Sequence, residues 1–177
     1  MELGMVGLGR MGGNMVRRLV LGGHACVAHD RDAAKVAELA GAAGPAGISA
    51  RGAASLAELV SALKKPRAVW IMLPSGAITE QTVSDLAGLL APGDAVIDGG
   101  NSFYQDDVRR AKSLRELGIA YLDVGTSGGV WGVDRGYCLM IGGEKDAVRR
   151  LEPIFRTLAP GRGDVAPSPG REGGTAE

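Results

Sequence analysis

The stretch Gly7-Leu8-Gly9-Arg10-Met11-Gly12 decides the fold of this 177-residue chain, because its glycines lie between a strand pattern and a helix pattern. Residues 3–6 form a short apolar run typical of a buried strand, and apolar residues then recur at the spacing of one helix face. A second apolar run covers residues 26–28, and Asp30 follows it. This strand, turn, helix and strand with a terminal acidic residue predicts a dinucleotide-binding unit.

Each glycine of this stretch has a separate mechanical purpose. Gly7 permits a tight turn, Gly9 lets the backbone approach a pyrophosphate, and Gly12 lets the helix pack close to the strand. The helix N-terminus would face the phosphates with unpaired N–H groups and a partial positive charge. The other interpretation is a glycine-rich turn that binds nothing, since the chain contains 29 glycines.

The composition restricts the class of protein. Lysine plus arginine equals aspartate plus glutamate at 20 each, and only 4% of residues are aromatic, so we expect no nucleic-acid partner. No apolar run approaches the roughly 20 residues that span a bilayer, and no signal-peptide pattern opens the chain, which indicates a cytoplasmic protein without a membrane partner. Cys26 and Cys138 lie in predicted strands, where we expect reduced core residues. The two histidines and two cysteines are scattered, which predicts no metal site.

Strand and helix patterns alternate along the chain. This alternation predicts an α/β fold with a Rossmann-like, doubly wound and mainly parallel sheet. Residues 1–159 would form the dinucleotide-binding domain, and residues 160–177, rich in glycine, proline and charge, would form a flexible tail or linker. The predicted strands are 3–6, 26–28, 68–73, 95–97, 119–124 and 138–141, with helices over 32–40, 56–63 and 104–117.

Several local signals refine this prediction. Residues 41–52 are small and glycine-rich, which favours a loop. Ser55 and Glu58 match a capping box, and Thr79 is expected to cap the following helix. Pro153 interrupts the last helical pattern, so we expect a kink or two short helices there.

Polar, glycine-rich segments follow the predicted strands and should meet at one edge of the sheet, where ligands of such folds bind. The Asn101 amide offers both donors and an acceptor. Ser127 and the N–H groups of Gly128 and Gly129 could hold a hydroxyl or carboxylate. Turn chemistry alone is the other explanation for each loop. These segments are residues 73–76, 98–102 and 125–129.

These segments also carry a family resemblance over residues 1–159. The chain resembles the N-terminal domain of 6-phosphogluconate dehydrogenase (decarboxylating), in the shorter branch of that family. The Ser-Gly-Gly loop is shared with other β-hydroxyacid dehydrogenases, so the Asp-Gly-Gly-Asn-Ser-x-Tyr motif at residues 98–104 is the discriminating feature. The matching motifs are Gly7-Leu8-Gly9-Arg10-Met11-Gly12-Gly13-Asn14, Asp98-Gly99-Gly100-Asn101-Ser102-Phe103-Tyr104, Ser127-Gly128-Gly129, Gly136 and Leu139-Met140-Ile141-Gly142-Gly143.

The resemblance implies roles for individual residues. Substrate contacts with the sugar acid are implied for Asn101, Ser127, Gly128 and Gly129. Cofactor contacts are implied for Leu8, Arg10, Met11, Met72, Leu73, Pro74 and Asn101, beside Gly7, Gly9, Gly12 and Asp30 of the phosphate-binding pattern.

The cofactor signals at the end of the second strand conflict. The Asp30 carboxylate can accept hydrogen bonds from both ribose hydroxyls and would repel a 2′-phosphate, which favours NAD. Many members of the family carry an uncharged residue there, followed by an arginine that grips the phosphate of NADP. Arg31 matches that arginine. We therefore expect NAD as the cofactor, with NADP as the alternative.

Two features depart from the family pattern. Val130 and Trp131 stand where the long members carry two glutamates, so no acidic role is assigned to those positions. The catalytic lysine and the His-Asn pair of the family lie on a helical domain beyond Glu177, so we expect no catalytic residue in this chain. Lys112 and Lys145 are on predicted helix surfaces away from the loop edge and would not substitute for that lysine.

The function implied for the parent protein is oxidation of 6-phosphogluconate at C3 and decarboxylation to ribulose 5-phosphate, in the pentose phosphate pathway. The partner would be a small sugar acid phosphate, and we expect a homo-oligomer at full length. One alternative is a 3-hydroxyisobutyrate-type dehydrogenase, against which residues 98–104 argue. A noncatalytic nucleotide-binding domain is another, favoured by the missing lysine.

A first prediction concerns the 177-residue chain by itself. It should bind a dinucleotide without reducing it, because general acid–base catalysis contributes about 10²- to 10⁴-fold in rate and lost substrate positioning costs more. The test is NADH or NADPH formation with 6-phosphogluconate. Turnover at an ordinary enzyme rate would contradict it.

Overall fold

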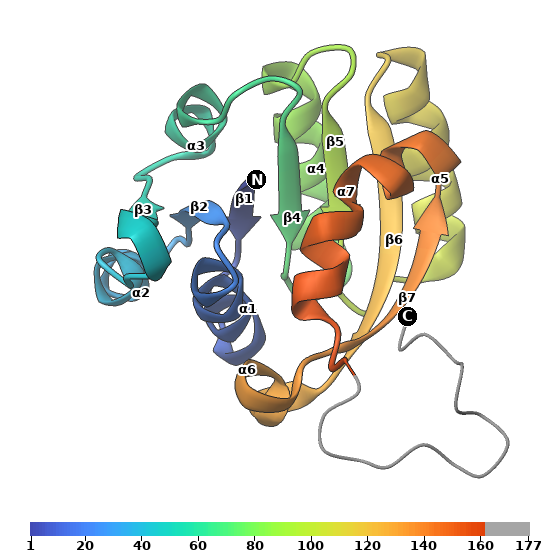
Figure 1. Ribbon diagram of the computed structural model, residues 1–177. Coiled ribbons are helices and arrows are strands. Elements are labelled where there is room, and N and C mark those ends of the chain that lie inside the picture. The colour runs from blue at the N-terminus through green and yellow to red at the C-terminus, as the bar shows by residue number, and fades with distance from the viewer. Residues whose placement is uncertain (162–177) are drawn as a thin grey trace, which may run out of the picture.

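The protein forms one twisted sheet with helices on both faces, seen in a computed structural model that describes residues 1–161 (Figure 1). Within these residues the strand order is β3-β2-β1-β4-β5-β6-β7, and all neighbours are parallel except the antiparallel pair β6–β7. This confirms the predicted doubly wound, mainly parallel α/β fold. The strands are β1 (Glu2–Val6), β2 (Ala25–His29), β3 (Ala50–Gly52), β4 (Ala68–Ile71), β5 (Ala95–Asp98), β6 (Ala120–Ser127) and β7 (Cys138–Gly143).

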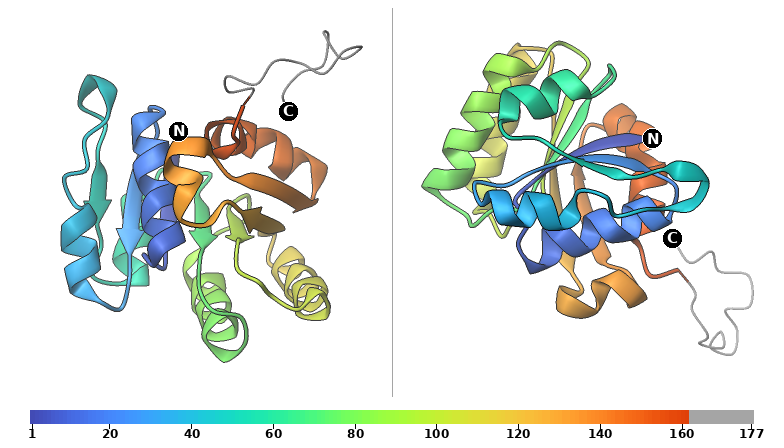
Figure 2. Two further views of the ribbon diagram at one scale, coloured as in Figure 1. Left: turned by 90° about the horizontal axis from the view of Figure 1, so that it is seen from below. Right: turned by 90° about the vertical axis from the view of Figure 1, so that its left-hand side faces the viewer.

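Helices cover both faces of the sheet (Figure 2), and a hydrophobic core fills the space between sheet and helices on each face. Side chains of α1, α2 and α7 build the first core, and side chains of α3, α4 and α5 build the second. The α-helices are α1 (Arg10–Leu21), α2 (Ala33–Leu39), α3 (Leu56–Ala62), α4 (Ala77–Leu89), α5 (Tyr104–Glu116), α6 (Gly132–Arg135) and α7 (Lys145–Leu158).

Side-chain caps fix the starts of two helices, α2 and α3. The Asp32 carboxylate accepts the N–H of Ala34 and caps α2. The Ser55 hydroxyl accepts the N–H of Glu58 at 3.1 Å and caps α3, as predicted. The Glu58 carboxylate accepts the N–H of Ala54 instead of that of the cap itself. The reciprocal half of the capping box is therefore displaced by one residue.

The region over residues 41–52 is not purely a loop. It contains a single 3₁₀ turn, Pro45–Gly47, and ends in β3, which pairs with β2 through Cys26↔Ala50 and Ala28↔Gly52. A three-residue strand that includes a glycine carries no period-2 pattern. Its pairing partner, and not its own sequence, makes it a strand.

The predicted cap of α4 was wrong, and the last helix is not divided into two. Gly76 is the N-cap of α4, and Thr79 lies inside the helix, where its hydroxyl donates to the Pro74 carbonyl. Pro153 does not divide α7, which runs unbroken from Lys145 to Leu158. Pro153 lies on the exposed face, where water can hydrate the carbonyl it leaves unpaired, while Leu151, Ile154 and Phe155 hold the opposite face in the core.

The two cysteines differ in their surroundings. Cys26 is buried in β2, whereas Cys138 is exposed on the edge strand β7, so the prediction of a core position was wrong for Cys138. Five of the six residues of β7 are exposed, so this strand lies largely outside the core.

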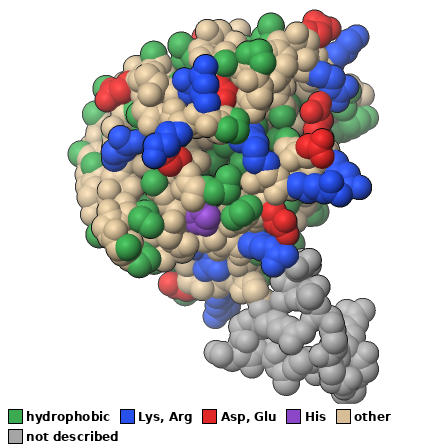
Figure 3. Space-filling model, turned by 45° about the horizontal axis from the view of Figure 1, so that its top comes forward, with side chains coloured by type: hydrophobic (Ala, Val, Ile, Leu, Met, Phe, Trp, Pro, Cys, Tyr) green, Lys and Arg blue, Asp and Glu red, His purple; other side chains and the backbone are tan. Residues whose placement is uncertain are grey.

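Three further observations concern the described residues. Among residues 1–161, no helix is both long enough and apolar enough to cross a membrane. Basic and acidic side chains are scattered over the face shown in Figure 3 without separating by sign. The predicted tail over residues 160–177 falls outside the described part of the chain apart from its first two residues.

Candidate functional site

Two hollows adjoin at the carboxyl edge of the sheet, at the point where the strand order reverses. β1 and β4 are neighbours there, and the chain leaves them toward opposite faces, which opens a crevice between their following loops. The first hollow has a volume of about 340 Å³ and the second of about 920 Å³. Both are lined by Gly9 and by the segment 72–74, so together they form one groove.

The glycine turn after β1 has the geometry that its sequence predicts. Gly7 has φ +94°, a conformation that side chains rarely adopt. A Cβ on Gly12 would collide with the Gly7 carbonyl oxygen, so a glycine is required for α1 to approach β1. A Cβ on Gly9 would meet no protein atom within 4 Å, and Gly9 lines both hollows. Space is therefore open above Gly9 at the start of α1.

Asp30 connects the end of β2 to the glycine turn. Its Oδ2 accepts the N–H of Leu8 at 2.7 Å, and its Oδ1 accepts the N–H of Asp32 at 2.9 Å. Partial burial opposes ionisation, but these two backbone donors, together with the charges of Lys35 and His29, hold the pKa of Asp30 below its usual value. A fixed negative charge thus borders the first hollow, which Arg31 and Lys35 also line.

The second hollow collects the polar residues predicted for substrate. Asn101 and Ser127 both line it, although Asn101 follows β5 and Ser127 ends β6, and Gly129 lies beside them. Arg10 and Met11 reach the same hollow from the start of α1. The sheet edge therefore brings together residues that are more than a hundred positions apart in the sequence.

Two of the predicted residues line neither hollow. The Leu8 side chain is 5% exposed in the first core, and only its N–H faces Asp30. Gly128 has φ +152° and packs against the Tyr137 ring, which a Cβ would strike. Both shape the site through the backbone.

The loop that follows Ser127 packs on a buried tyrosine, Tyr137. The Tyr137 ring is fully buried and also leaves no room for a Cβ on Gly132. Burial raises the pKa of Tyr137, so its hydroxyl stays neutral. The Arg18 guanidinium donates to the carbonyls of Thr157 and Ala159 at the end of α7, and to that of Val133 in α6. These contacts fasten the loop to α1 and α7.

Sequence reasoning missed a further group of residues at the groove. Ser75 and Thr126 lie within the predicted segments 73–76 and 125–129, although neither was given a role of its own. The rest come from helices and the edge strand, where the sequence carries no ligand signal. The missed lining residues on the helices and the edge strand are Lys35, Leu56, Ile78, Thr82 and Met140.

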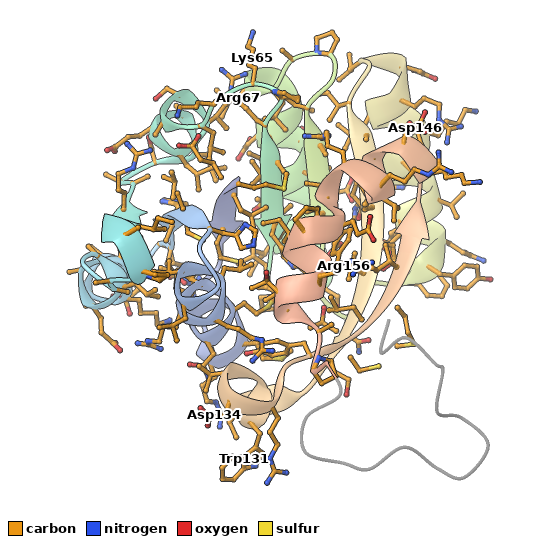
Figure 4. All side chains as sticks on the ribbon, viewed as in Figure 1. Lys65, Arg67, Trp131, Asp134, Asp146 and Arg156 are labelled. Carbon is orange, nitrogen blue, oxygen red and sulfur yellow. The ribbon has the colours of Figure 1, made fainter. Side chains whose placement is uncertain are left out.

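Several other positions bear on the chemistry. Val130 lines the second hollow, and Trp131 is 64% exposed beside it at the lower edge in Figure 4, with the Arg135 guanidinium 5.6 Å from its ring centroid. Lys112 and Lys145 line neither hollow. Within residues 1–161, no three His, Cys, Asp or Glu side chains are grouped so that they could hold a metal ion.

The fold and the crevice define a Rossmann-type dinucleotide-binding domain. Residues 2–165 match the family described as the NAD binding domain of 6-phosphogluconate dehydrogenase. The chain belongs to this family.

Individual relatives agree with the family match. The chain is 44% identical over 161 residues to the NAD(+)-dependent, decarboxylating 6-phosphogluconate dehydrogenase of Haloferax volcanii, covering 91% of this chain and 51% of that protein. The solved 6-phosphogluconate dehydrogenase of Plasmodium falciparum superposes with a TM-score of 0.82 at 27% identity, over 92% of this chain and 35% of that one. The solved 3-hydroxyisobutyrate dehydrogenase of Mycobacterium tuberculosis superposes with a TM-score of 0.77 at 26% identity, over 89% of this chain and 52% of that one. The chain thus spans about half the length of its curated relative from Haloferax volcanii.

The geometry of the glycine turn predicts different outcomes for two alanine substitutions. Gly9→Ala should change the free energy of unfolding by less than about 1 kcal/mol, because the added methyl meets no protein atom. Gly12→Ala should cost about 2 kcal/mol or more, because the methyl strikes the Gly7 carbonyl. Urea unfolding measures both values, and titration with NAD should show weaker binding by the stable Gly9→Ala variant. Unchanged NAD affinity in that variant would argue against a dinucleotide above Gly9.

Proposed function

We propose that this chain binds a nicotinamide dinucleotide along the groove and serves as the cofactor domain of a decarboxylating 6-phosphogluconate dehydrogenase. The observation that carries the proposal is the continuity of the two hollows across Gly9. A dinucleotide has two ends joined by a pyrophosphate, and a helix N-terminus with an open glycine is suited to that charged centre.

The first hollow fits the adenosine end. Asp30, fixed by two backbone donors, presents a carboxylate that can accept hydrogen bonds from ribose hydroxyls. Its negative charge disfavours a 2′-phosphate, while Arg31 and Lys35 on the same hollow attract one. We infer that the chain prefers NAD and retains some affinity for NADP.

The second hollow fits the nicotinamide end and the sugar acid. Asn101 and Ser127 supply neutral donors and acceptors there, and Arg10 adds a positive charge near the middle of the groove. When bound, the nicotinamide would accept a hydride from C3 of the sugar acid. The residues of this chain would orient the two reactants: Asn101 by its amide, Ser127 by its hydroxyl, and the loop glycines by their N–H groups.

Two alternative functions lead to different expectations. A 3-hydroxyisobutyrate-type enzyme shares the fold, but residues 98–104 match the phosphogluconate type. A noncatalytic nucleotide-binding domain would bind the dinucleotide and ignore the sugar acid. Binding of 6-phosphogluconate to the full-length protein separates both alternatives from the proposal.

The cofactor preference can be tested at the first hollow. The chain should bind NAD more tightly than NADP, and Asp30→Asn should shift the ratio of the two affinities toward NADP because it removes the repelling charge. Both affinities should also fall, because the asparagine amide has a single oxygen and can replace only one of the two carboxylate oxygens that accept the N–H groups of Leu8 and Asp32. Arg31→Gln is the matched variant and should shift the ratio toward NAD. Calorimetric titration measures both constants, and tenfold tighter binding of NADP by the unsubstituted chain would overturn the preference.

The substrate end is tested by Ser127→Ala. NAD affinity of the 177-residue chain should be almost unchanged, because the hydroxyl is assigned to the sugar acid. In the full-length enzyme, the substitution should weaken sugar-acid binding and turnover by about 1 to 3 kcal/mol, the cost of leaving a polar partner without its hydrogen bond. Measurements of melting temperature, KM and kcat check this. A loss of stability alone, with unchanged kinetics in the folded fraction, would make the loop a structural turn.

A further inference from the structure

A cluster of charged and polar side chains is buried beneath the loop that carries Asn101. Asp98, Asp107, Arg110 and Tyr121 are each at most 5% exposed, and they come from β5, α5 and β6. Buried ion pairs are costly, and well-packed apolar residues often replace them without loss of stability. A gain in stability therefore does not explain these buried charges. The contacts of the cluster indicate a role in holding the loop.

Both oxygens of Asp98 hold the residues that flank Asn101. Oδ1 accepts the N–H of Gly100 at 2.9 Å, and Oδ2 accepts the hydroxyl of Ser102 at 2.7 Å. One buried carboxylate thus fixes the loop on each side of the residue that lines the groove. The position of Asn101 depends on the position of this carboxylate.

The Arg110 guanidinium of α5 contacts the Asp98 carboxylate from the helix side of the sheet. Its Nη1 lies 3.4 Å from Asp98 Oδ2, 3.4 Å from the Ser102 hydroxyl and 3.3 Å from Asp107 Oδ1. Its Nε donates to Glu80 of α4 at 2.9 Å. A hydrogen bond from Arg109 lowers the pKa of Glu80 to about 2, so Glu80 stays charged and orients the guanidinium.

Tyr121 completes the cluster from β6. Its hydroxyl lies 3.0 Å from Asp98 Oδ2 and 2.8 Å from Asp107 Oδ1, but it has only one proton to donate. Burial, and then the charge of Asp98, raise the pKa of Asp107. The Tyr121 hydroxyl thus connects the two carboxylates and lies within hydrogen-bond distance of the Asp98 oxygen that also accepts from Ser102.

We propose that Asp98, Arg110 and Tyr121 are positioning residues that hold Asn101 toward the nicotinamide end of the groove. The proposal rests on the proposed function, because it assigns that end of the groove to the nicotinamide. None of the three residues lines either hollow, so they would act only through the loop.

The test compares NAD with ADP-ribose, which lacks the nicotinamide, on the 177-residue chain. Tyr121→Phe and Ser102→Ala each remove one hydroxyl that contacts Asp98. Each should weaken NAD binding about three- to tenfold and change ADP-ribose binding by less than about twofold. When Asn101→Ala is already present, Tyr121→Phe should not change the ratio of NAD affinity to ADP-ribose affinity further, because the network would act through Asn101.

The opposite end of β5 offers a matched control. Asp94 is 1% exposed, like Asp98, and it too pairs with an arginine, Arg67, at 3.1 Å. It precedes β5, whereas Asp98 ends it, and Arg67 lies at the far end of the molecule from the groove (Figure 4). Asp94→Asn should lower the melting temperature and leave the ratio of NAD to ADP-ribose affinity unchanged, whereas Asp98→Asn should change that ratio.

A second measurement needs no cofactor. Exchange of the Gly100 amide hydrogen should be faster in Tyr121→Phe than in the unsubstituted chain, because its acceptor is less firmly held. An unchanged affinity ratio, an equal change in Asp94→Asn, or an additive effect with Asn101→Ala would overturn the proposal. Should the unsubstituted chain bind neither ligand, the proposed function fails. If the Gly100 amide of Tyr121→Phe also exchanged at the unchanged rate, the positioning role of the cluster would be contradicted independently of the proposed function.

Discussion

The close approach of α1 to the turn after β1 is the constraint on which the rest of the structure depends. Gly12 lies against the Gly7 carbonyl without room for a methyl group, and this contact sets where the first turn of α1 points. The space over Gly9 is open because α1 begins directly after this residue. Both hollows border that space, so the direction of one helix determines where the groove runs.

Two of the loops at the carboxyl edge are held in the same way. They lack regular backbone pairing, and buried or half-buried side chains supply the missing partners. Asp30 accepts the N–H of Leu8 in the first loop, and Asp98 accepts that of Gly100 in the second. Each carboxylate lies at or just after the end of a strand and turns back onto a loop, so the rigid sheet sets the position of the loop backbone.

The third loop is held differently. Below Ser127, the Tyr137 ring fills the space that side chains at Gly128 and Gly132 would need. Arg18 connects the same region to the end of α7 through main-chain carbonyls. Steric fit and the Arg18 guanidinium thus hold this loop without a buried carboxylate. Neighbouring loops of one groove are therefore held by different physical means.

The sequence by itself determined the order of most strands and helices, the glycine turn and the segments that form the groove. Those features depend on local periodicity, on glycines that need positive φ or close approach, and on the rule that parallel strands end at one edge. Only the tertiary structure decided the rest. β3 is a strand because β2 pairs with it, and α7 continues through Pro153 because its opposite face is buried. The partners of Asp98 lie on a helix and another strand, so no local pattern could reveal them.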